Sequence, residues 1–366
     1  MNSDLLYQLA LTMIPQVGPV QAKILLQQAE PREIFRMKKS LLEKIEGIGT
    51  VRASAINHFA GFPQAEKEIA FIEKYHIRPL FITEPQYPRR LLNCYDSPTL
   101  LFYKGEADLN VPKVVAVIGT RNHTEYGKQS TEKIIRELSS HNIHVVSGLA
   151  FGIDALAHKA ALKNKLVTTG VLAHGLDQLY PPEHTGLARD MIREGGGLLT
   201  EFRQGVKPDK HHFPSRNRIV AGMSDLTLVI ETGQKGGSMI TADLANGYNR
   251  DVFAIPGRIN DSRSEGCNLL IQQNKAVLFT TTEELLLTMG WEERAVPRPK
   301  NQTALFIELS ANEQRIMGIL KEKDAVHIDE INLRSGLSSS TVAAVILNLE
   351  LQNVIVSLPG KLYKLS

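Results

Sequence analysis

The sequence predicts an α/β protein: a doubly wound, mostly parallel sheet, with an all-α domain before it and a winged helix after it. Three observations support this fold class. Short apolar runs alternate with helical patterns over residues 113–290. Mostly helical sequence with two similar glycine turns precedes residue 110, and three helices followed by a hairpin come after residue 305.

The composition is that of an ordinary globular protein. Of the 366 residues, 43% are hydrophobic and 22% are charged, which allows one sizeable core and one or two smaller domains. No apolar run is long enough to cross a bilayer, and the start MNSDLLYQLA lacks the pattern of a signal peptide. We therefore expect a cytoplasmic protein with no membrane partner.

Charge and cysteine usage narrow the function classes. The formal net charge is only +3, so a nucleic-acid surface has to be a local concentration of cations. Cys94 and Cys267 lie far apart and have no metal-ligand spacing. We expect two small buried side chains, no disulfide and no metal site.

The first 110 residues contain two similar turns, IPQVGPVQAKIL at residues 14–25 and IEGIGTVRASAI at residues 45–56. Each has the pattern of a helix-hairpin-helix, in which amides at the start of the second helix can face a DNA phosphate. Lys23 and Arg52 are the nearby cations. The alternative is that both are tight turns that only pack a small helical bundle, and the sequence leaves the two interpretations open.

Residues 113–290 contain the alternation that predicts the parallel sheet. The expected strands are residues 114–118, 143–147, 166–173, 197–201, 226–230, 251–255 and 276–279. The expected helices are residues 126–140 and 153–162, one from about residue 184 and one from about residue 238. Ligands of such sheets bind at the carboxyl ends of the strands, near the point where the strand order reverses.

The tail after residue 305 predicts a winged helix whose third helix carries no Lys or Arg. Val342, Val345, Ile346 and Leu349 share one face of that helix. The tail has 6 Lys/Arg and 7 Asp/Glu, a net charge of −1, whereas helices that bind duplex DNA depend on neutralising phosphates. This favours a protein-interaction or dimer-docking role, although Lys361 and Lys364 on the wing keep DNA binding open.

Four turns of the central region carry small or cationic residues. GTR at residues 119–121 lacks the G-x-G-x-x-G of a dinucleotide-binding turn. Its arginine suits a phosphate that is bound by a guanidinium group through charge-assisted hydrogen bonds. The others are SGLA at residues 147–150, RNR at residues 216–218 and KGGS at residues 235–238. We expect the sheet to join them into one phosphate-binding rim. The RNR arginines have a structural alternative, which is to tie loops together through carboxylates.

A hydrolase is a further possibility, because Ser147, Asp154 and His158 lie close together in the sequence. The chain has no G-x-S-x-G motif, and Asp154 and His158 stand four residues apart within one expected helix. Such a pair is more often structural than catalytic.

These motifs together resemble the DprA/Smf family of DNA-processing proteins. They occur in the order GTR, SGLAFGIDALAHKAAL, GLDQLYPPEH, FPSRNRIVAG, GGSMITA, and VFAIPG followed by GCNLLI, and the resemblance covers about residues 80–290. It implies an extended Rossmann-like core that binds single-stranded DNA, forms a homodimer through that core and delivers the strand to the RecA recombinase during DNA uptake. It implies a protein that is not an enzyme and uses no cofactor.

The resemblance also implies domain boundaries and site residues. The domains are a helix-hairpin-helix (SAM-like) domain at residues 1–80, the core at 81–290, a linker at 291–304 and the winged helix at 305–366. Carried over by position, the DNA-binding residues are Gly119, Thr120, Arg121, Ser147, Gly148, Leu149, Ala150, Arg216, Asn217, Arg218, Lys235, Gly237 and Ser238.

One position departs from the family pattern. Pro182 follows the Tyr-Pro of GLDQLYP, where family members often have a cation, so one phosphate contact is missing and Arg189 or Lys210 would have to replace it. Nearby aromatic side chains, Phe151, Tyr180 and Phe213, are candidates for stacking on bases, although core packing is their more common role.

Two other function classes compete with DNA binding. Related folds that hydrolyse nucleotides place a glutamate after the glycine turn, where this chain has Thr241, Ala242 and Asp243. A nucleotide-hydrolysing or nucleotide-sensing enzyme is therefore the less favoured alternative. A winged-helix regulator with a ligand-sensing core is disfavoured by the uncharged third helix.

Overall fold

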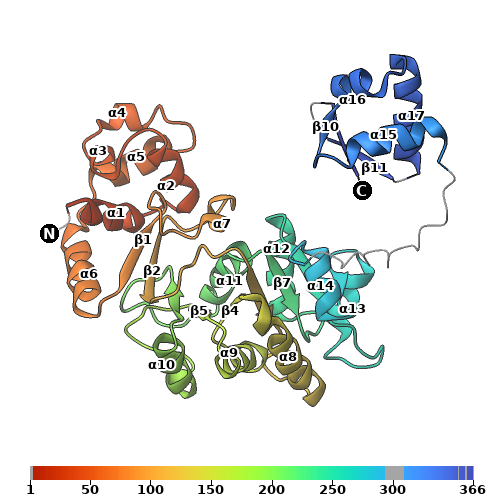
Figure 1. Ribbon diagram of the computed structural model, residues 1–366. Helices are drawn as coiled ribbons and strands as arrows, with labels where there is room; N and C mark the ends of the chain where they lie inside the picture. Colours follow the sequence, from red (N-terminus) through yellow and green to blue (C-terminus); the bar gives the residue numbers. More distant parts are fainter. Residues whose placement is uncertain (1–2, 293–308, 353, 359–360, 366) are drawn as a thin grey trace. The chain divides into compact units, whose positions relative to one another are not determined.

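The computed structural model describes residues 3–292, 309–352, 354–358 and 361–365 (Figure 1). It consists of two compact units, Met1–Glu292 and Glu293–Ser366, which are described separately. From residue 293 onward the expected linker lies outside the described residues. The finer boundary expected at residue 80 stays a prediction.

Within the described residues, the larger unit is built on a nine-stranded sheet with the order β1-β2-β6-β5-β4-β3-β7-β8-β9. The strands from β6 to β9 in this order are parallel, which confirms the mostly parallel fold class. They are β3 (Val114–Ile118), β4 (His144–Ser147), β5 (Thr168–Val171), β6 (Gly197–Thr200), β7 (Leu226–Val229), β8 (Asp251–Ala254) and β9 (Val277–Leu278).

Two strands in the region expected to be mostly helical correct the prediction. β1 (Arg78–Phe81) and β2 (Leu100–Gly105) pair antiparallel with each other, and β2 pairs antiparallel with β6. Alternate residues of β2 face different cores: Leu100 and Phe102 pack with the amino-terminal helices, while Leu101 and Tyr103 pack with the central core. Burial on both faces gives a continuous apolar run, which periodicity does not distinguish from a buried helix.

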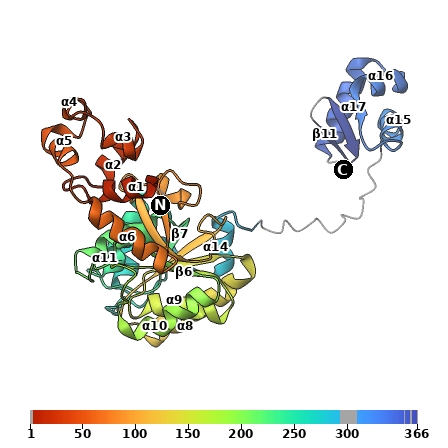
Figure 2. The same ribbon diagram turned by 90° about the vertical axis from the view of Figure 1, so that its left-hand side faces the viewer.

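Helices cover both faces of the sheet (Figure 2). Val115 and Val117 of β3 pack against α8 and α9, whereas Ala116 packs on the other side with α11 and α12. One layer contains α8 (Glu125–Leu138), α9 (Ile153–Lys163), α10 (Thr185–Arg193) and α14 (Thr282–Thr288). The opposite layer contains α7 (Arg89–Leu92), α11 (His212–Gly222), α12 (Gly237–Gly247) and α13 (Glu265–Gln272).

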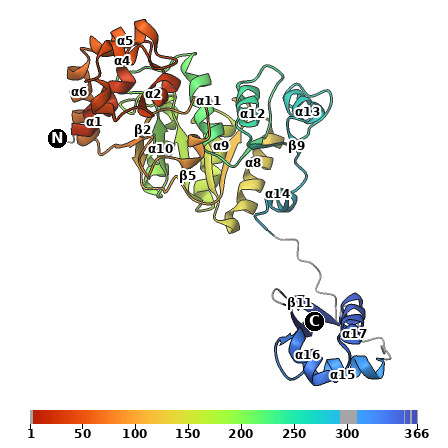
Figure 3. The ribbon, with the colours of Figure 1, turned by 90° about the horizontal axis from the view of Figure 1, so that it is seen from above.

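The amino-terminal helices pack at the end of the sheet that holds β1 and β2 (Figure 3). Both cations of the two glycine turns are engaged within the chain. Lys23 Nζ donates to Cys94 O at 3.0 Å, and Arg52 Nε donates to Gln16 O at 2.9 Å. The structure therefore favours the packing interpretation of these turns. The helices are α1 (Ser3–Met13), α2 (Pro19–Leu26), α3 (Pro31–Ile34), α4 (Lys39–Leu42), α5 (Gly49–Asn57) and α6 (Phe62–Lys74).

The smaller unit has the expected winged-helix elements and one strand that was not predicted. Helices α15 (Ala311–Leu320), α16 (Ile328–Ser335) and α17 (Ser339–Leu351) pack with a sheet of order β10-β12-β11. The hairpin is β11 (Ile355–Leu358) and β12 (Leu362–Leu365), and the extra strand is β10 (Val326–His327). The predicted apolar face of α17 is buried.

Two expectations from composition can also be compared with the structure. Cys94 and Cys267 are both buried, as predicted, and both are free thiols. Across the described residues, every helix is too short or too polar to pass through a membrane.

Candidate nucleic-acid interface

The candidate site lies where the strand order of the sheet reverses. β3 has β4 on one side and β7 on the other, and Ile118 at the end of β3 pairs with Val229 at the end of β7. The helix after β3 covers one face of the sheet and the helix after β7 covers the other. The two connections therefore diverge and leave a crevice at the carboxyl edge.

This crevice is a cleft of about 710 Å³, called the switch-point cleft below. It is formed by the turns after β3, β4 and β7, by the start of α11 and by the loop before it. Its lining includes Gly119, Thr120, Arg121, Gly148, Ala150, Asp154, Tyr180, Lys210, Phe213, Arg216, Asn217, Gly237, Ser238 and Thr241.

The GTR turn is fixed from both sides. Thr120 N donates to Glu231 O at 2.7 Å, and Ile153 N donates to Thr120 O at 3.2 Å. A Cβ on Gly119 would lie 2.5 Å from Ile153 Cγ1, so only glycine fits. The exposed Arg121 guanidinium stands 5.2 Å from the ring centre of Phe213 and makes no hydrogen bond or ion pair within the described residues.

The SGLA turn is held by buried polar contacts. Ser147 is buried, and its Oγ donates to Val117 O at 2.6 Å, which ties this hydroxyl to β3. His158 lies beneath the turn, with Nε2 at 2.5 Å from Gly148 O and Nδ1 at 2.7 Å from Thr168 Oγ1. Both ring nitrogens of His158 are thus bonded to groups other than Ser147 and Asp154, so the three residues do not form a nucleophile chain and their structural interpretation is favoured.

We expect the protein to lose stability as the pH falls from neutral, because two buried histidines stay neutral in the fold. Burial lowers the pKa of His144 and of His158 from 6.5 to about 4. As the pH falls, the unfolded chain therefore protonates these two histidines at a higher pH than the folded chain does. The free energy of unfolding should fall by about 2 kcal/mol per histidine near pH 5, which urea titrations at pH 7 and 5 would measure.

A matched variant measures how much of this pH dependence comes from His144. His144→Gln keeps a side-chain partner for Thr169 Oγ1, to which His144 Nε2 bonds at 2.8 Å, and should remove about half of the pH dependence. A free energy of unfolding that is equal at the two pH values would contradict the expectation.

The two arginines of the RNR segment have different roles. Arg216 is buried and lines the cleft, and its guanidinium donates to Val171 O and, at 3.1 Å, to Asn217 Oδ1. Burial raises the pKa of the neighbouring Asp154 carboxyl, and the charge of Arg216 opposes that rise. Arg218 instead forms an ion pair with Glu201 and donates to Asp96 O, away from the cleft.

The turn after β7 brings the start of α12 to the cleft. Gly237 and Ser238 begin this 11-residue helix, so their amides have no partner within the helix. Ser238 Oγ donates to Thr232 Oγ1 at 2.7 Å, which fixes the turn. Lys235 precedes the helix, is exposed and is not part of the cleft lining.

The structure brings nine of the thirteen expected site residues together in the cleft. The nine are Gly119, Thr120, Arg121, Gly148, Ala150, Arg216, Asn217, Gly237 and Ser238. The other four lie elsewhere: Ser147 and Leu149 are buried beside it, Arg218 is paired with Glu201, and Lys235 is on the adjoining turn.

The cations and the aromatic side chains of the lining suit a polyanion that also contains aromatic rings. The charged groups at the cleft are Arg121, Lys210 and Arg216 against Asp154 and Asp209. Lys210 was expected only as a substitute for the cation missing at Pro182, and Asp209 was not expected. Tyr180 is 45% exposed, and its ring centre lies 6.3 Å from that of Phe213.

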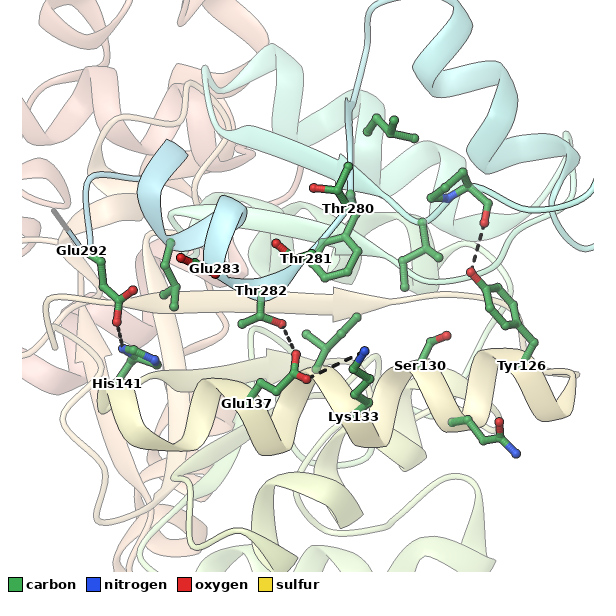
Figure 4. A pocket seen from close by; sticks show the side chains of 17 residues that line it. Tyr126, Ser130, Lys133, Glu137, His141, Thr280, Thr281, Thr282, Glu283 and Glu292 are labelled. Atoms are coloured by element: carbon green, nitrogen blue, oxygen red, sulfur yellow. Dashed lines mark hydrogen bonds and ion pairs between the residues drawn. The ribbon is translucent and has the colours of Figure 1, made fainter. Parts of the chain in front are cut away.

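A second and larger cleft, of about 820 Å³, lies between α8 and α14 (Figure 4). Its Lys and His side chains already have carboxylate partners. Lys133 lies 3.9 Å from Glu137, and His141 lies 3.1 Å from Glu292. Glu283 adds a further negative charge to the lining, so this cleft does not suit phosphate. In the described part of the chain, no group of three or more acidic, His or Cys residues could hold a metal ion.

Comparison with known proteins identifies the family. The family model for DNA recombination-mediator protein A matches residues 78–290, more than half of the chain. The chain belongs to this family. The DprA winged helix domain model matches residues 299–361. Protein Smf of Synechocystis is 32% identical over 99% of both chains, and DNA processing protein DprA of Streptococcus pneumoniae is 38% identical over 69% of this chain and 96% of its own.

Two solved DprA structures have the same fold. The X-ray structure of DprA from Streptococcus pneumoniae superposes with a TM-score of 0.67 and 34% identity, over 78% of this chain and 97% of its own. DprA from Helicobacter pylori, described for its single-stranded DNA binding mode, has a TM-score of 0.53 and 31% identity, over 59% and 97% of the two chains.

Proposed function

We propose that this DprA-family chain binds single-stranded DNA in the switch-point cleft, without reading its sequence and without breaking a bond. The observation that carries the proposal is that two arginines lie near the ring of Phe213. The guanidinium of the exposed Arg121 is 5.2 Å from the ring centre, and that of the buried Arg216 is 6.0 Å from it. The single-strand binding described for the Helicobacter pylori relative supports the same ligand.

The contacts that we propose are of two kinds. Phosphates are bound by Arg121, by Lys210 and by the amides of Gly237 and Ser238 at the start of α12. Bases stack on Tyr180 and Phe213, which needs no particular sequence. Each phosphate that a cation neutralises should add roughly −0.7 to the slope of log affinity against log salt.

The winged helix is not needed for this binding. The outward residues of α17, among them Ala343, Ala344 and Leu347, are exposed and uncharged. We expect a chain ending at residue 304 to bind single-stranded oligonucleotides within about threefold of the full chain, since phosphate contacts dominate affinity. Anisotropy titrations of the two proteins would test this, and a loss of tenfold or more would assign the winged helix a part in binding.

Further parts of the proposal come from the family resemblance. We propose that the protein acts in the cytoplasm, forms a homodimer through the Rossmann-like core and delivers the bound strand to the RecA recombinase. We also propose the domain boundaries at residues 80, 290 and 304. Limited proteolysis would test the boundaries. A strand-exchange assay with purified RecA, on single-stranded DNA already bound by this protein, would test the delivery.

The main experiment measures DNA binding and, in the same samples, any hydrolysis of DNA or nucleotide. Labelled single-stranded and double-stranded oligonucleotides are titrated with the protein, and the DNA and any added nucleoside phosphates are then recovered and measured. We expect tight binding of the single strand and weaker binding of the duplex. We also expect the DNA and the nucleoside phosphates to be recovered intact. Hydrolysed nucleotide would favour the enzyme alternative, and preference for duplex would favour a regulator.

A further inference from the structure

The loop between β8 and α13, residues 256–264, lies at the same sheet edge as the switch-point cleft. β8 runs parallel to β7, with Ala254 opposite Val229, so both strands end at that edge. Gly266 N donates to Thr232 O at 2.8 Å, which joins the far end of the loop to the turn that lines the cleft. This loop is therefore the next connection along the rim.

The backbone of this loop is fixed by hydrogen bonds of Asp261 and of Asn268 in α13. Asp261 Oδ1 accepts from Arg263 N and Asp261 Oδ2 accepts from Ser264 Oγ, both at 3.0 Å. Asn268 bonds to Gly257 N at 3.2 Å and to Gly257 O at 3.1 Å. These bonds shape the loop without using either of its guanidinium groups.

The two arginines of the loop are available to a ligand. Arg258 is exposed and Arg263 is partly exposed, and neither guanidinium forms a hydrogen bond or an ion pair within the described residues. Structural arginines of the same unit differ: Arg90 is paired with Asp225 and Arg218 with Glu201. Asp261 nearby reduces the positive charge of the loop but does not cancel it.

We propose that this loop continues the single-strand track beyond the cleft. Arg258 and Arg263 bind phosphates of the nucleotides that leave the cleft past Lys235, which is exposed on the turn between the two sites. Ile259 at the loop tip is 89% exposed and offers an apolar contact to a base. This inference rests on the proposed function, and it makes the binding site longer than the cleft.

The test uses two probe lengths. Oligothymidylate of about 5 nucleotides fills only the cleft, and one of about 20 nucleotides also reaches the loop. For the variant Arg258→Gln with Arg263→Gln, the Kd of the long probe should rise about 5- to 20-fold and its salt slope should become shallower by roughly 1.4. The Kd of the short probe should stay within about twofold of the wild type.

A matched variant controls for the loss of charge. Arg136→Gln with Lys163→Gln removes two exposed cations from the ends of α8 and α9, at the opposite edge of the sheet, and should leave both probes unchanged. The inference is overturned if the loop variant binds the long probe like the wild type, or if both probes weaken equally. A wild-type protein that binds neither probe would overturn the proposed function as well.

Discussion

Replacing Arg121 by alanine is expected to weaken single-strand binding by about 1 to 3 kcal/mol, the range for losing a charged hydrogen-bond partner. Arg121 is an exposed cation that lines the cleft, and no ion pair within the described residues uses it. Its removal should therefore cost little stability. Anisotropy titrations at fixed salt would measure the affinity, and urea unfolding would verify the fold.

The control for Arg121→Ala is Arg136→Ala, in α8 at the other edge of the sheet. Arg136 is also exposed, so both variants lose one positive charge. We expect the control to bind almost like the wild type. Equal losses in the two variants would mean that general charge, and not the cleft, determines affinity.

Replacing Gly152 by alanine is expected to reduce both stability and binding. Gly152 has φ +82°, and a Cβ there would overlap Thr120 O and lie 2.5 Å from Arg121 O. The substitution strains the backbone and pushes the GTR turn out of place, at a cost of about 2 to 5 kcal/mol in the free energy of unfolding. Affinity should fall by tenfold or more because Arg121 is displaced. Urea unfolding and single-strand titration would measure the two effects.

Gly186→Ala is the matched change for Gly152→Ala. Gly186 lies in α10, its φ is not positive, and a Cβ there meets nothing within 4 Å. Alanine should be neutral or slightly stabilising at this helical position. The structural argument for the GTR turn fails if Gly152→Ala is as stable and binds as tightly as Gly186→Ala.

The parallel half of the fold could be predicted because each strand there is a short apolar run followed by a helical pattern. β2 could not, since its residues alternate between two cores and its partner β6 lies about a hundred residues further along the chain. Its pairing depends on tertiary packing, which a local pattern does not contain.

The sequence predicts which turns form the candidate site, but it predicts less well which side chains face the cleft. Arg216 and Arg218 stand two residues apart on a helix, so they point to different sides and cannot both face one cleft. Arg218 accordingly pairs with Glu201. Lys210 lines the cleft from a loop without regular structure, and only the folded chain brings it into the same cleft as Arg121.

The central claim is that single-stranded DNA occupies the switch-point cleft, and photo-crosslinking tests it most directly. A thio-substituted oligothymidylate would be crosslinked to the full chain and the modified peptides identified by mass spectrometry. We predict crosslinks within residues 118–121, 148–154, 208–217 and 232–241, which line the cleft. Crosslinks confined to the cleft between α8 and α14, or to the helices before residue 75, would contradict it.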